Sequence, residues 1–222
     1  MISPTSHSVD VDLITLAARD INTDIFEISL NEPTNNFFYD PWKVKREFIG
    51  TVWEQILDSL NETHGEARLK ILKPGSCYYS HADIDDRYHL NISGNKSYLV
   101  NLDNDCLYPL KNNGMWYEMD AGIRHSAVNF GNQLRIQLVV RKLLPINNLN
   151  DYKSIKISLS EDRYDYRYIF DDIYSPWFNK LVKQNLLNNF CVKDKEVYFD
   201  IDITQLEELI IKCPPGFEIS EL

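Results

Sequence analysis

Apolar residues recur at four-residue spacing in one early segment of the chain and predict a helix there. The segment is "YDPWKVKREFIGTVWEQILDSLNET", residues 39–63. Its apolar positions, spaced as on one face of a helix, are Val44, Phe48, Val52, Ile56 and Leu60. Asp40 and Pro41 have the form of an N-cap and a first helical residue. We therefore expect a helix that begins at Pro41 and ends before Gly65.

Between residues 67 and 143 the pattern changes to short apolar runs separated by turns. The runs are "ARLKIL", "SCYYSHA", "RYHLNI", "SYLVNL", "MWYEM", "RHSAVN" and "LRIQLVV". The segments between them, such as "KPG", "SGNK" and "DAG", carry the Gly or Asn that tight turns require. Short strands at near-regular spacing are typical of an antiparallel sandwich or barrel, and not of alternating strand–helix units.

The chain after residue 145 is rich in Asn, Lys and Tyr and predicts a smaller mixed unit. A helix is expected from Ser175, with Pro176 in its first turn, through "WFNKLVKQNLL". The strand "KEVYFDI" follows, and then a capping box of Thr204 and Glu207 that opens the helix "QLEELIIK". Nothing in this part indicates chemistry, so we interpret it as an α+β extension packed on the barrel.

The composition of the chain is most informative about which classes of partner are not expected. The 222 residues are 44% hydrophobic, enough for one core with a smaller appendage, and their net charge is −10. Nucleic acids and anionic membranes attract clustered Lys and Arg, so neither is expected as a partner. The chain shows no signal-peptide pattern at its start, no apolar run of membrane-spanning length, and no CxxC spacing among its four cysteines. We therefore expect a reduced, cytoplasmic protein.

The stretch "SHADIDDRYHL", residues 80–90, holds two of the five histidines. Side chains two apart on a strand share a face, so His81 and Asp83 project together if this segment is extended. A second histidine from another strand would complete a set of two histidines and one carboxylate, which leaves coordination positions open and suits non-haem Fe(II). The candidates for it are His89 and His125, because the other histidines lie outside the strand region.

His125 is the favoured third ligand. His89 shares its strand face with Arg87, and a cation there disfavours a metal and favours an anion. Ten residues beyond His125, Arg135 interrupts an apolar strand, where an arginine is costly unless it has an anionic partner. A dicarboxylate that reaches from the metal into the barrel would be such a partner for a guanidinium.

In these residues the chain resembles the aspartyl/asparaginyl β-hydroxylase family of Fe(II)- and 2-oxoglutarate-dependent oxygenases. The likeness covers about a third of the chain. It consists of a Pro-Gly turn, a metal histidine, an Arg-x-His pair, and a second metal histidine with Asn four residues and Arg ten residues further on. The corresponding residues are Pro74, Gly75, His81, Arg87, His89, His125, Asn129 and Arg135.

The resemblance implies a mainly β fold with a double-stranded β-helix core, jelly-roll or cupin-like, and flanking helices. Together with the change of pattern after residue 145, this gives an expected oxygenase domain with N-terminal helical support over residues 1–145 and an accessory α+β extension over residues 146–222. Iron is then held by His81 and His125, with Asp83 as in the branch that has a full triad. The cosubstrate 2-oxoglutarate is held by Arg135, with help from Arg87 and His89.

The implied reaction is hydroxylation of a C–H bond, coupled to decarboxylation of 2-oxoglutarate. The implied substrate is an aspartyl or asparaginyl residue or a related amino acid, so we expect a small-molecule or peptide partner. Two alternatives stay open. One is a binding module that holds a metal without turnover. The other is a zinc or iron cupin-like hydrolase or isomerase, which would need no arginine at position 135. The sequence predicts no oligomeric state.

Neighbouring residues are expected to have structural roles. Asp85 and Asp86 are interpreted as solvated turn residues, and Asn129 as a turn residue that orients the strand of His125. Arg124 is expected to point outward, because neighbours on a strand face opposite sides. Four aromatic residues are expected in the core or the pocket wall: Tyr78, Tyr79, Trp116 and Tyr117.

Overall fold

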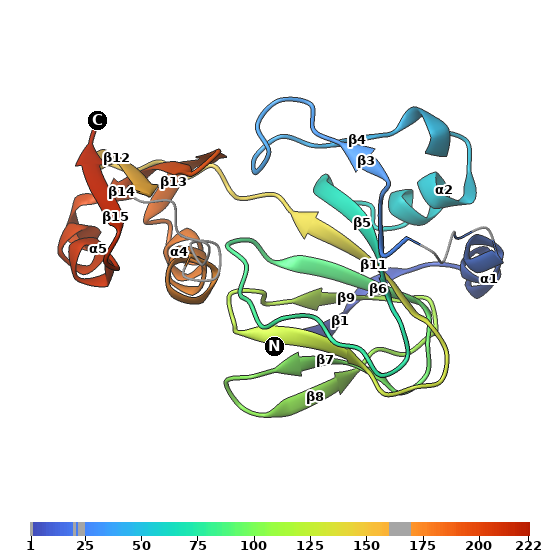
Figure 1. Cartoon of the computed structure of the whole chain (residues 1–222). Helices are drawn as coiled ribbons and strands as arrows, with labels where there is room; N and C mark the ends of the chain where they lie inside the picture. Colours follow the sequence, from blue (N-terminus) through green and yellow to red (C-terminus); the bar gives the residue numbers. More distant parts are fainter. Residues whose placement is uncertain (1, 20, 22–24, 160–169) are drawn as a thin grey trace.

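The computed structural model describes residues 2–19, 21, 25–159 and 170–222 (Figure 1). The strands of its larger part are β1 (Ile2–Ser8), β2 (Glu27–Ser29), β3 (Asn31–Glu32), β4 (Lys43–Val44), β5 (His64–Leu72), β6 (Arg87–Ser93), β7 (Ser97–Asn101), β8 (Cys106–Pro109), β9 (Met115–Met119), β10 (His125–Asn129) and β11 (Arg135–Lys142). The helices of this part are α1 (Val11–Arg19), α2 (Val52–Asp58) and the short 3₁₀ turn η1 (Arg46–Phe48).

The strands of this part form a jelly roll. One sheet has the order β1-β9-β6-β11-β5-β2, and a second has the order β10-β7-β8. Residues 76–83 extend the second sheet, because the Tyr78 amide donates to the Ala127 carbonyl (2.9 Å) and His81 forms a bridge with His125. From β5 to β11, eight extended segments are thus divided between two antiparallel sheets, as in a jelly roll. The predicted fold class is confirmed.

The larger sheet is apolar on its outer face and polar on its inner face. Along β6 the alternate residues Tyr88, Leu90 and Ile92 pack in one apolar cluster with α1 and α2. The residues between them face the other way, and Arg87 and His89 line a cavity inside the barrel. β5 and β11 alternate in the same manner. The helices therefore stabilise the sheet from outside, which leaves its inner face for polar side chains.

The early helix is shorter than its apolar spacing predicts. Thr51 caps α2, and its side chain accepts a hydrogen bond from the Trp53 amide (3.2 Å). Gly50 has a φ of +74°, a left-handed conformation that interrupts the helix before this cap. The prediction that the helix begins at Pro41 is therefore wrong, and Lys43–Val44 form β4 instead.

Six of the seven predicted strands are confirmed by β5, β6, β7, β9, β10 and β11. The seventh, residues 76–82, is held by isolated bridges and is not a regular strand. The apolar pattern does not predict α1 or the outer strands β1, β2 and β8. β1 pairs only with β9 and carries Pro4, and such an edge strand needs no continuous apolar pattern.

The C-terminal part contains a sheet of its own, with strand order β13-β14-β12-β15. Its elements are β12 (Tyr152–Leu159), the π-helical turn η2 (Phe170–Tyr174), α4 (Ser175–Lys183), β13 (Leu187–Lys193), β14 (Glu196–Asp202), the 3₁₀ turn η3 (Ile203–Gln205), α5 (Leu206–Lys212) and β15 (Phe217–Glu221). The expected helix at Ser175 and the expected strand are confirmed. The capping box is wrong, because the Asp202 side chain accepts from the Thr204 amide (3.0 Å) ahead of α5.

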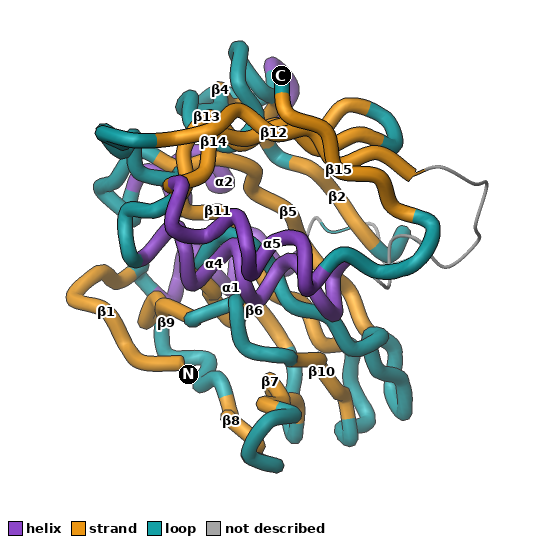
Figure 2. Tube along the Cα trace, turned by 90° about the vertical axis from the view of Figure 1, so that its left-hand side faces the viewer, coloured by secondary structure: helices purple, strands orange, loops and turns teal. Residues whose placement is uncertain are grey.

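The C-terminal part packs beside one end of the jelly roll, as Figure 1 shows, and in Figure 2 α4 and α5 lie in front of the barrel strands. Its apolar cluster includes Phe38, Ile84 and Leu144, which come from the earlier part of the chain. The division at residues 145 and 146 stays a prediction. Of the helices in the described ranges, none is both long and apolar enough to cross a membrane.

Candidate metal centre

Two backbone bridges bring the metal-ligand candidates together. The His81 amide donates to the His125 carbonyl (3.0 Å), and the His125 amide donates back to the His81 carbonyl (2.8 Å). The ring centroids are then 4.4 Å apart. Asp83 Oδ2 lies 3.9 Å from His81 Nε2 and 3.7 Å from His125 Nε2. All three ligand atoms lie within 4.8 Å of one another, so they can share one ion.

The remaining ring nitrogens fix how the two histidines are protonated. His81 Nδ1 lies 3.1 Å from the Tyr79 carbonyl, and His125 Nδ1 lies 2.8 Å from the Ile123 carbonyl. A carbonyl only accepts hydrogen bonds, so Nδ1 carries the proton in each neutral ring. The Nε2 lone pairs are left to face Asp83, which is the arrangement that a metal ligand needs. Burial lowers the pKa of His125 to about 4, which favours its neutral form.

Arg87 holds the carboxylate of the triad. Its Nη2 lies 2.9 Å from Asp83 Oδ1, while Oδ2 is the oxygen that faces the histidines. Burial alone would raise the pKa of Asp83, but Arg87 and the two imidazoles hold it well below its ordinary value. Asp83 is therefore an anion at neutral pH with one oxygen directed at the metal position.

Asp85 is not a solvated turn residue, and this expectation is corrected. Asp85 is 2% exposed, and its carboxylate pairs with Arg87 on one side and Arg141 on the other. A buried carboxylate requires such partners, and both arginines come from neighbouring strands. Asp86 is partly buried and accepts from the Ala121 amide (3.2 Å). The loop between the pair His81 and Asp83 and the pair Arg87 and His89 is thus held in place by the buried charge of Asp85.

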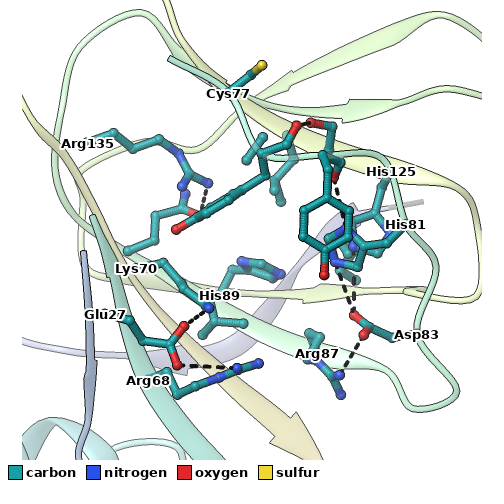
Figure 3. Close-up of a pocket in the computed structure, with 18 of the residues that line it drawn as sticks. Glu27, Arg68, Lys70, Cys77, His81, Asp83, Arg87, His89, His125 and Arg135 are labelled. Carbon is teal, nitrogen blue, oxygen red and sulfur yellow. Dashed lines mark hydrogen bonds and ion pairs between the residues drawn. The ribbon is translucent and has the colours of Figure 1, made fainter. Parts of the chain in front are cut away.

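The triad lies at one end of a cavity of about 570 Å³, which we call the metal pocket (Figure 3). Arg135 lines the same pocket and is 1% exposed. It donates a hydrogen bond to Gln137, and its Nε has no hydrogen-bond partner in the described part of the chain. Burial lowers the pKa of Arg135 to about 10. The guanidinium remains a cation at neutral pH, and no carboxylate of the described residues pairs with it.

The other cations of the metal pocket differ from Arg135. Arg68 and Lys70 both pair with Glu27, and Arg87 pairs with Asp83 and Asp85. Among the described residues that line the pocket, Arg135 is the one arginine or lysine for which no ion pair is found. Removing an arginine from water without a counter-charge is costly, so an anion that entered the pocket beside Arg135 would be stabilised there.

His89 lies between Arg135 and the triad in Figure 3. It is 4% exposed, and neither ring nitrogen makes a hydrogen bond of good geometry with a described residue, although the Gln137 side chain lies close enough to act against burial on the pKa of His89. Burial, with the charge of Arg135, lowers the pKa of His89 to about 3, so its ring is neutral. A buried imidazole with two unused nitrogens fits a group that meets a ligand.

Arg87 lines the metal pocket, as predicted, but its charge is already matched by two carboxylates. A cosubstrate carboxylate would be its third anion, so its predicted help with 2-oxoglutarate has less physical support than that of Arg135. Asp83 and Asp85 more than offset the effect of burial and keep the pKa of Arg87 above its ordinary value. Its contacts make it a positioning residue for Asp83.

Three further residues contribute to the site although no role in binding was predicted for them from the sequence. Gln137 is 1% exposed and accepts from Arg135, on the same strand face. The buried Tyr78 hydroxyl has no hydrogen-bond partner in the described chain, and the charge of Arg135 acts to lower the pKa of Tyr78 against the larger opposing effect of burial. Arg141, on β11, pairs with Asp85. The two-residue spacing from Arg135 could have identified Gln137, whereas the other contacts join distant strands.

The remaining expectations concern supporting residues. Asn129 is the last residue of β10 and not a turn residue, which corrects that part of the expectation. It is fully buried, and its Nδ2 donates to the Leu72 (3.0 Å) and Gln133 (2.8 Å) carbonyls, which orients the strand of His125 as expected. Arg124 is exposed and lies 3.6 Å from Asp172, so it points outward as expected. Trp116 is in the core, and Tyr78 and Tyr79 line the pocket.

Helix α4 clamps the loops that carry the triad. Asn179 is 4% exposed, and its Nδ2 donates to the Ile84 carbonyl (3.0 Å) and to Asp86 Oδ1 (3.2 Å). Gly122, three residues before His125, lies so close that a Cβ there would be 2.3 Å from Asn179 Oδ1. The C-terminal part therefore contacts the loop that follows Asp83 and the loop that precedes His125.

Comparison with known proteins adds only distant likenesses. No family model and no curated protein sequence matches the chain. A cupin domain from Bordetella pertussis Tohama I is 14% identical, with a TM-score of 0.31 over 34% of this chain and 78% of that one. The structure of CapF with the inhibitor 3-isopropenyl-tropolone is 17% identical, with a TM-score of 0.30 over 37% of this chain and 25% of that one. A Pseudomonas putida prolyl-4-hydroxylase is 16% identical, with a TM-score of 0.39 over 64% of this chain and 86% of that one. Likenesses at this level carry no functional argument, and the jelly-roll assignment rests on the strand order.

Proposed function

We propose that the protein is an Fe(II)- and 2-oxoglutarate-dependent oxygenase that hydroxylates a C–H bond of a second substrate. The observation that carries this proposal is the buried Arg135, which has no ion pair among the described residues and lines the same cavity as the triad. Two histidines and a carboxylate alone suit several metal reactions. Together with a buried cation that lacks an anion, they suit a ligand that chelates the metal at one end and carries a carboxylate at the other.

In this proposal each pocket residue has a separate task. His81, Asp83 and His125 hold Fe(II), and Arg135 binds the far carboxylate of 2-oxoglutarate through a bidentate, charge-assisted contact. His89 offers a neutral hydrogen-bonding ring between them. Bound iron and 2-oxoglutarate supply dioxygen activation, with formation of succinate and carbon dioxide and insertion of one oxygen atom into the substrate. The buried walls restrict water around these groups.

Membership of the aspartyl/asparaginyl β-hydroxylase family is part of the proposal and is supported by the motif spacing alone. An aspartyl, asparaginyl or related amino-acid substrate, a cytoplasmic location and the two-part division at residue 145 likewise remain predictions. The contacts of Asn179 favour a revised role for the C-terminal part, as a support for the metal loops.

Anaerobic titration of the Fe(II)-loaded protein with 2-oxoglutarate tests the proposal. We expect a visible charge-transfer band that saturates at one equivalent, because the 2-oxo acid chelates the metal. Glutarate, which lacks the 2-oxo group, is the matched control and should give no band. If 2-oxoglutarate also gives none, the oxygenase proposal fails. Retained metal would then favour the binding module, and turnover without 2-oxoglutarate would favour a cupin-like hydrolase or isomerase.

A further inference from the structure

A second cavity of about 440 Å³, which we call the interface cavity, lies between the jelly roll and the C-terminal part. Its volume is within the range of small-ligand sites. Most of its wall is aromatic or aliphatic. The apolar side chains come from both parts of the chain and include Phe37, Phe38, Ile157, Phe190, Val197 and Phe217.

The interface cavity adjoins the metal pocket. Asp83 and Arg87 line both cavities. A molecule in the interface cavity can therefore contact the same carboxylate–guanidinium pair that borders the metal position. The two cavities are neighbours across this pair, so a group bound in the interface cavity would lie next to the metal centre.

Six charged residues among those described line the wall. Asp83, Asp85, Arg87 and Arg141 pair with one another, and Asp194 and Lys195 lie in the turn between β13 and β14. Asp85 pairs with Arg87 and Arg141, and Arg87 also pairs with Asp83. The Arg141 guanidinium lies 4.4 Å from the centroid of the Phe37 ring, where it makes a cation–π contact. In contrast to Arg135 in the metal pocket, Arg87 and Arg141 each have a carboxylate partner, and Lys195 also has an interaction partner. An ionised ligand group would therefore find no unpaired cation among the described residues of this wall.

One polar atom of the wall is unused. Arg141 is 9% exposed, and its Nε has no hydrogen-bond partner in the described part of the chain. Of the described side chains that line the interface cavity, it is the one with such a buried atom. A buried N–H favours a neutral acceptor, such as an amide carbonyl, because a carboxylate would meet Asp83 and Asp85 nearby.

We propose that the interface cavity binds an uncharged amide with an aromatic or branched aliphatic side chain, as the part of the prime substrate beside the oxidised group. This inference rests on the proposed function for its link to the metal. It concerns the neighbouring group and not the oxidised atom. Burial of the apolar side chain supplies affinity, and the amide supplies orientation.

Ligand-observed NMR on the full chain, without metal and with Zn(II), tests this proposal. The probes are N-acetyl-L-phenylalanine amide, N-acetyl-L-leucine amide and N-acetyl-L-aspartic acid amide. We expect the two apolar amides to bind at least about tenfold more tightly than the acidic one. Val192→Trp, at a half-exposed position in the cavity wall, should weaken them by about tenfold or more.

The control is Lys193→Trp, on the same strand but outside the cavity lining, which should change binding by less than about twofold. Lys195→Trp, at another position in the cavity wall, is the second cavity-filling variant and replaces Val192→Trp if that variant does not fold. Absence of binding by the apolar amides, or binding that neither filling variant changes, overturns the inference. A charge-transfer band without amide binding removes this inference alone. If the apolar amides bind but 2-oxoglutarate gives no charge-transfer band, the interface cavity remains a binding site and the oxygenase proposal fails.

Discussion

Arg87 Nη2 contacts Asp83 Oδ1 over 2.9 Å, and Asp83 Oδ2 faces the Nε2 atoms of both histidines. One carboxylate thus joins a buried arginine to the metal position. Because Arg87 also pairs with Asp85, which in turn pairs with Arg141, the orientation of a metal ligand depends on charges that lie outside the triad. Such supporting contacts commonly change metal affinity by about 10- to 100-fold when they are removed.

The first prediction concerns this support. Arg87→Lys should lower Fe(II) affinity by about tenfold, because an ammonium keeps the charge but cannot hold Asp83 and Asp85 with one planar fork. Anaerobic Fe(II) titration measures the change. Arg124→Lys is the matched control, since the exposed Arg124 side chain contacts Asp172 and Ser80 and pairs with no triad side chain in the described structure; this variant should bind iron like wild type. Equal affinity in both variants would mean that Arg87 does not position the carboxylate.

The second prediction concerns the ligands themselves. His81→Ala and His125→Ala should each abolish stoichiometric Fe(II) binding, because each removes one of three donor atoms from one small cluster. Asp83→Ala should also bind poorly and should leave Arg87 with one carboxylate fewer. His7→Ala, a histidine paired with Glu62 outside the metal pocket, is the control. Stoichiometric binding by either histidine variant at limiting iron would exclude the assignment.

The metal-ligand candidates could be found in the sequence because their spacing depends on strand geometry alone. His81 and Asp83 share one extended segment, and Arg135 stands out in an apolar strand. The roles of Asp85, Arg141 and Asn179 could not be found in this way, because each depends on a contact between residues more than fifty positions apart or on burial in a loop. Asp85 reads as a turn residue in sequence and becomes a buried anion only when β6 and β11 pair.

The third prediction tests the clamp from α4. Asn179→Ala removes hydrogen bonds to the Ile84 carbonyl and Asp86, so unfolding free energy should fall by about 1–3 kcal/mol and Fe(II) affinity should fall as well. Asn147→Ala is the matched control, since Asn147 is also buried and donates to the Leu187 carbonyl (2.9 Å), away from the metal loops. It should lose stability with iron affinity unchanged. If Asn179→Ala behaves like this control, α4 supports the fold and not the metal centre.

The fourth prediction separates the two histidines that the sequence offers as ligands. His89→Ala should bind Fe(II) like wild type, while its affinity for 2-oxoglutarate falls by about tenfold, since one hydrogen bond to a buried ligand is lost. Sequential anaerobic titrations with Fe(II) and then with 2-oxoglutarate measure both values. Loss of iron with unchanged cosubstrate affinity would make His89 the ligand in place of His125.

The last prediction concerns Arg135, whose charge the described chain leaves without a counter-ion. A bidentate contact between this guanidinium and a carboxylate contributes a few kcal/mol, and each 1.4 kcal/mol is about a factor of ten in affinity. Arg135→Ala should therefore weaken 2-oxoglutarate binding by about 100-fold or more. Arg135→Lys should be intermediate, because it keeps the charge and loses the fork. Fe(II) affinity should survive in both variants, since Arg135 is no ligand.

Two measurements check the prediction independently. The charge-transfer titration gives the affinity for 2-oxoglutarate directly. Thermal unfolding of the Fe(II) protein gives it indirectly, because a ligand that binds only the folded state raises the midpoint, and the rise grows with the logarithm of ligand concentration over Kd. Saturating 2-oxoglutarate should raise the midpoint of wild type and leave that of Arg135→Ala nearly unchanged. Arg68→Ala serves as the control, because Arg68 lines the same pocket but already pairs with Glu27 and Glu66. If Arg135→Ala titrates like wild type while Arg68→Ala does not, the anion binds at the Glu27 end of the pocket and the cosubstrate does not reach Arg135.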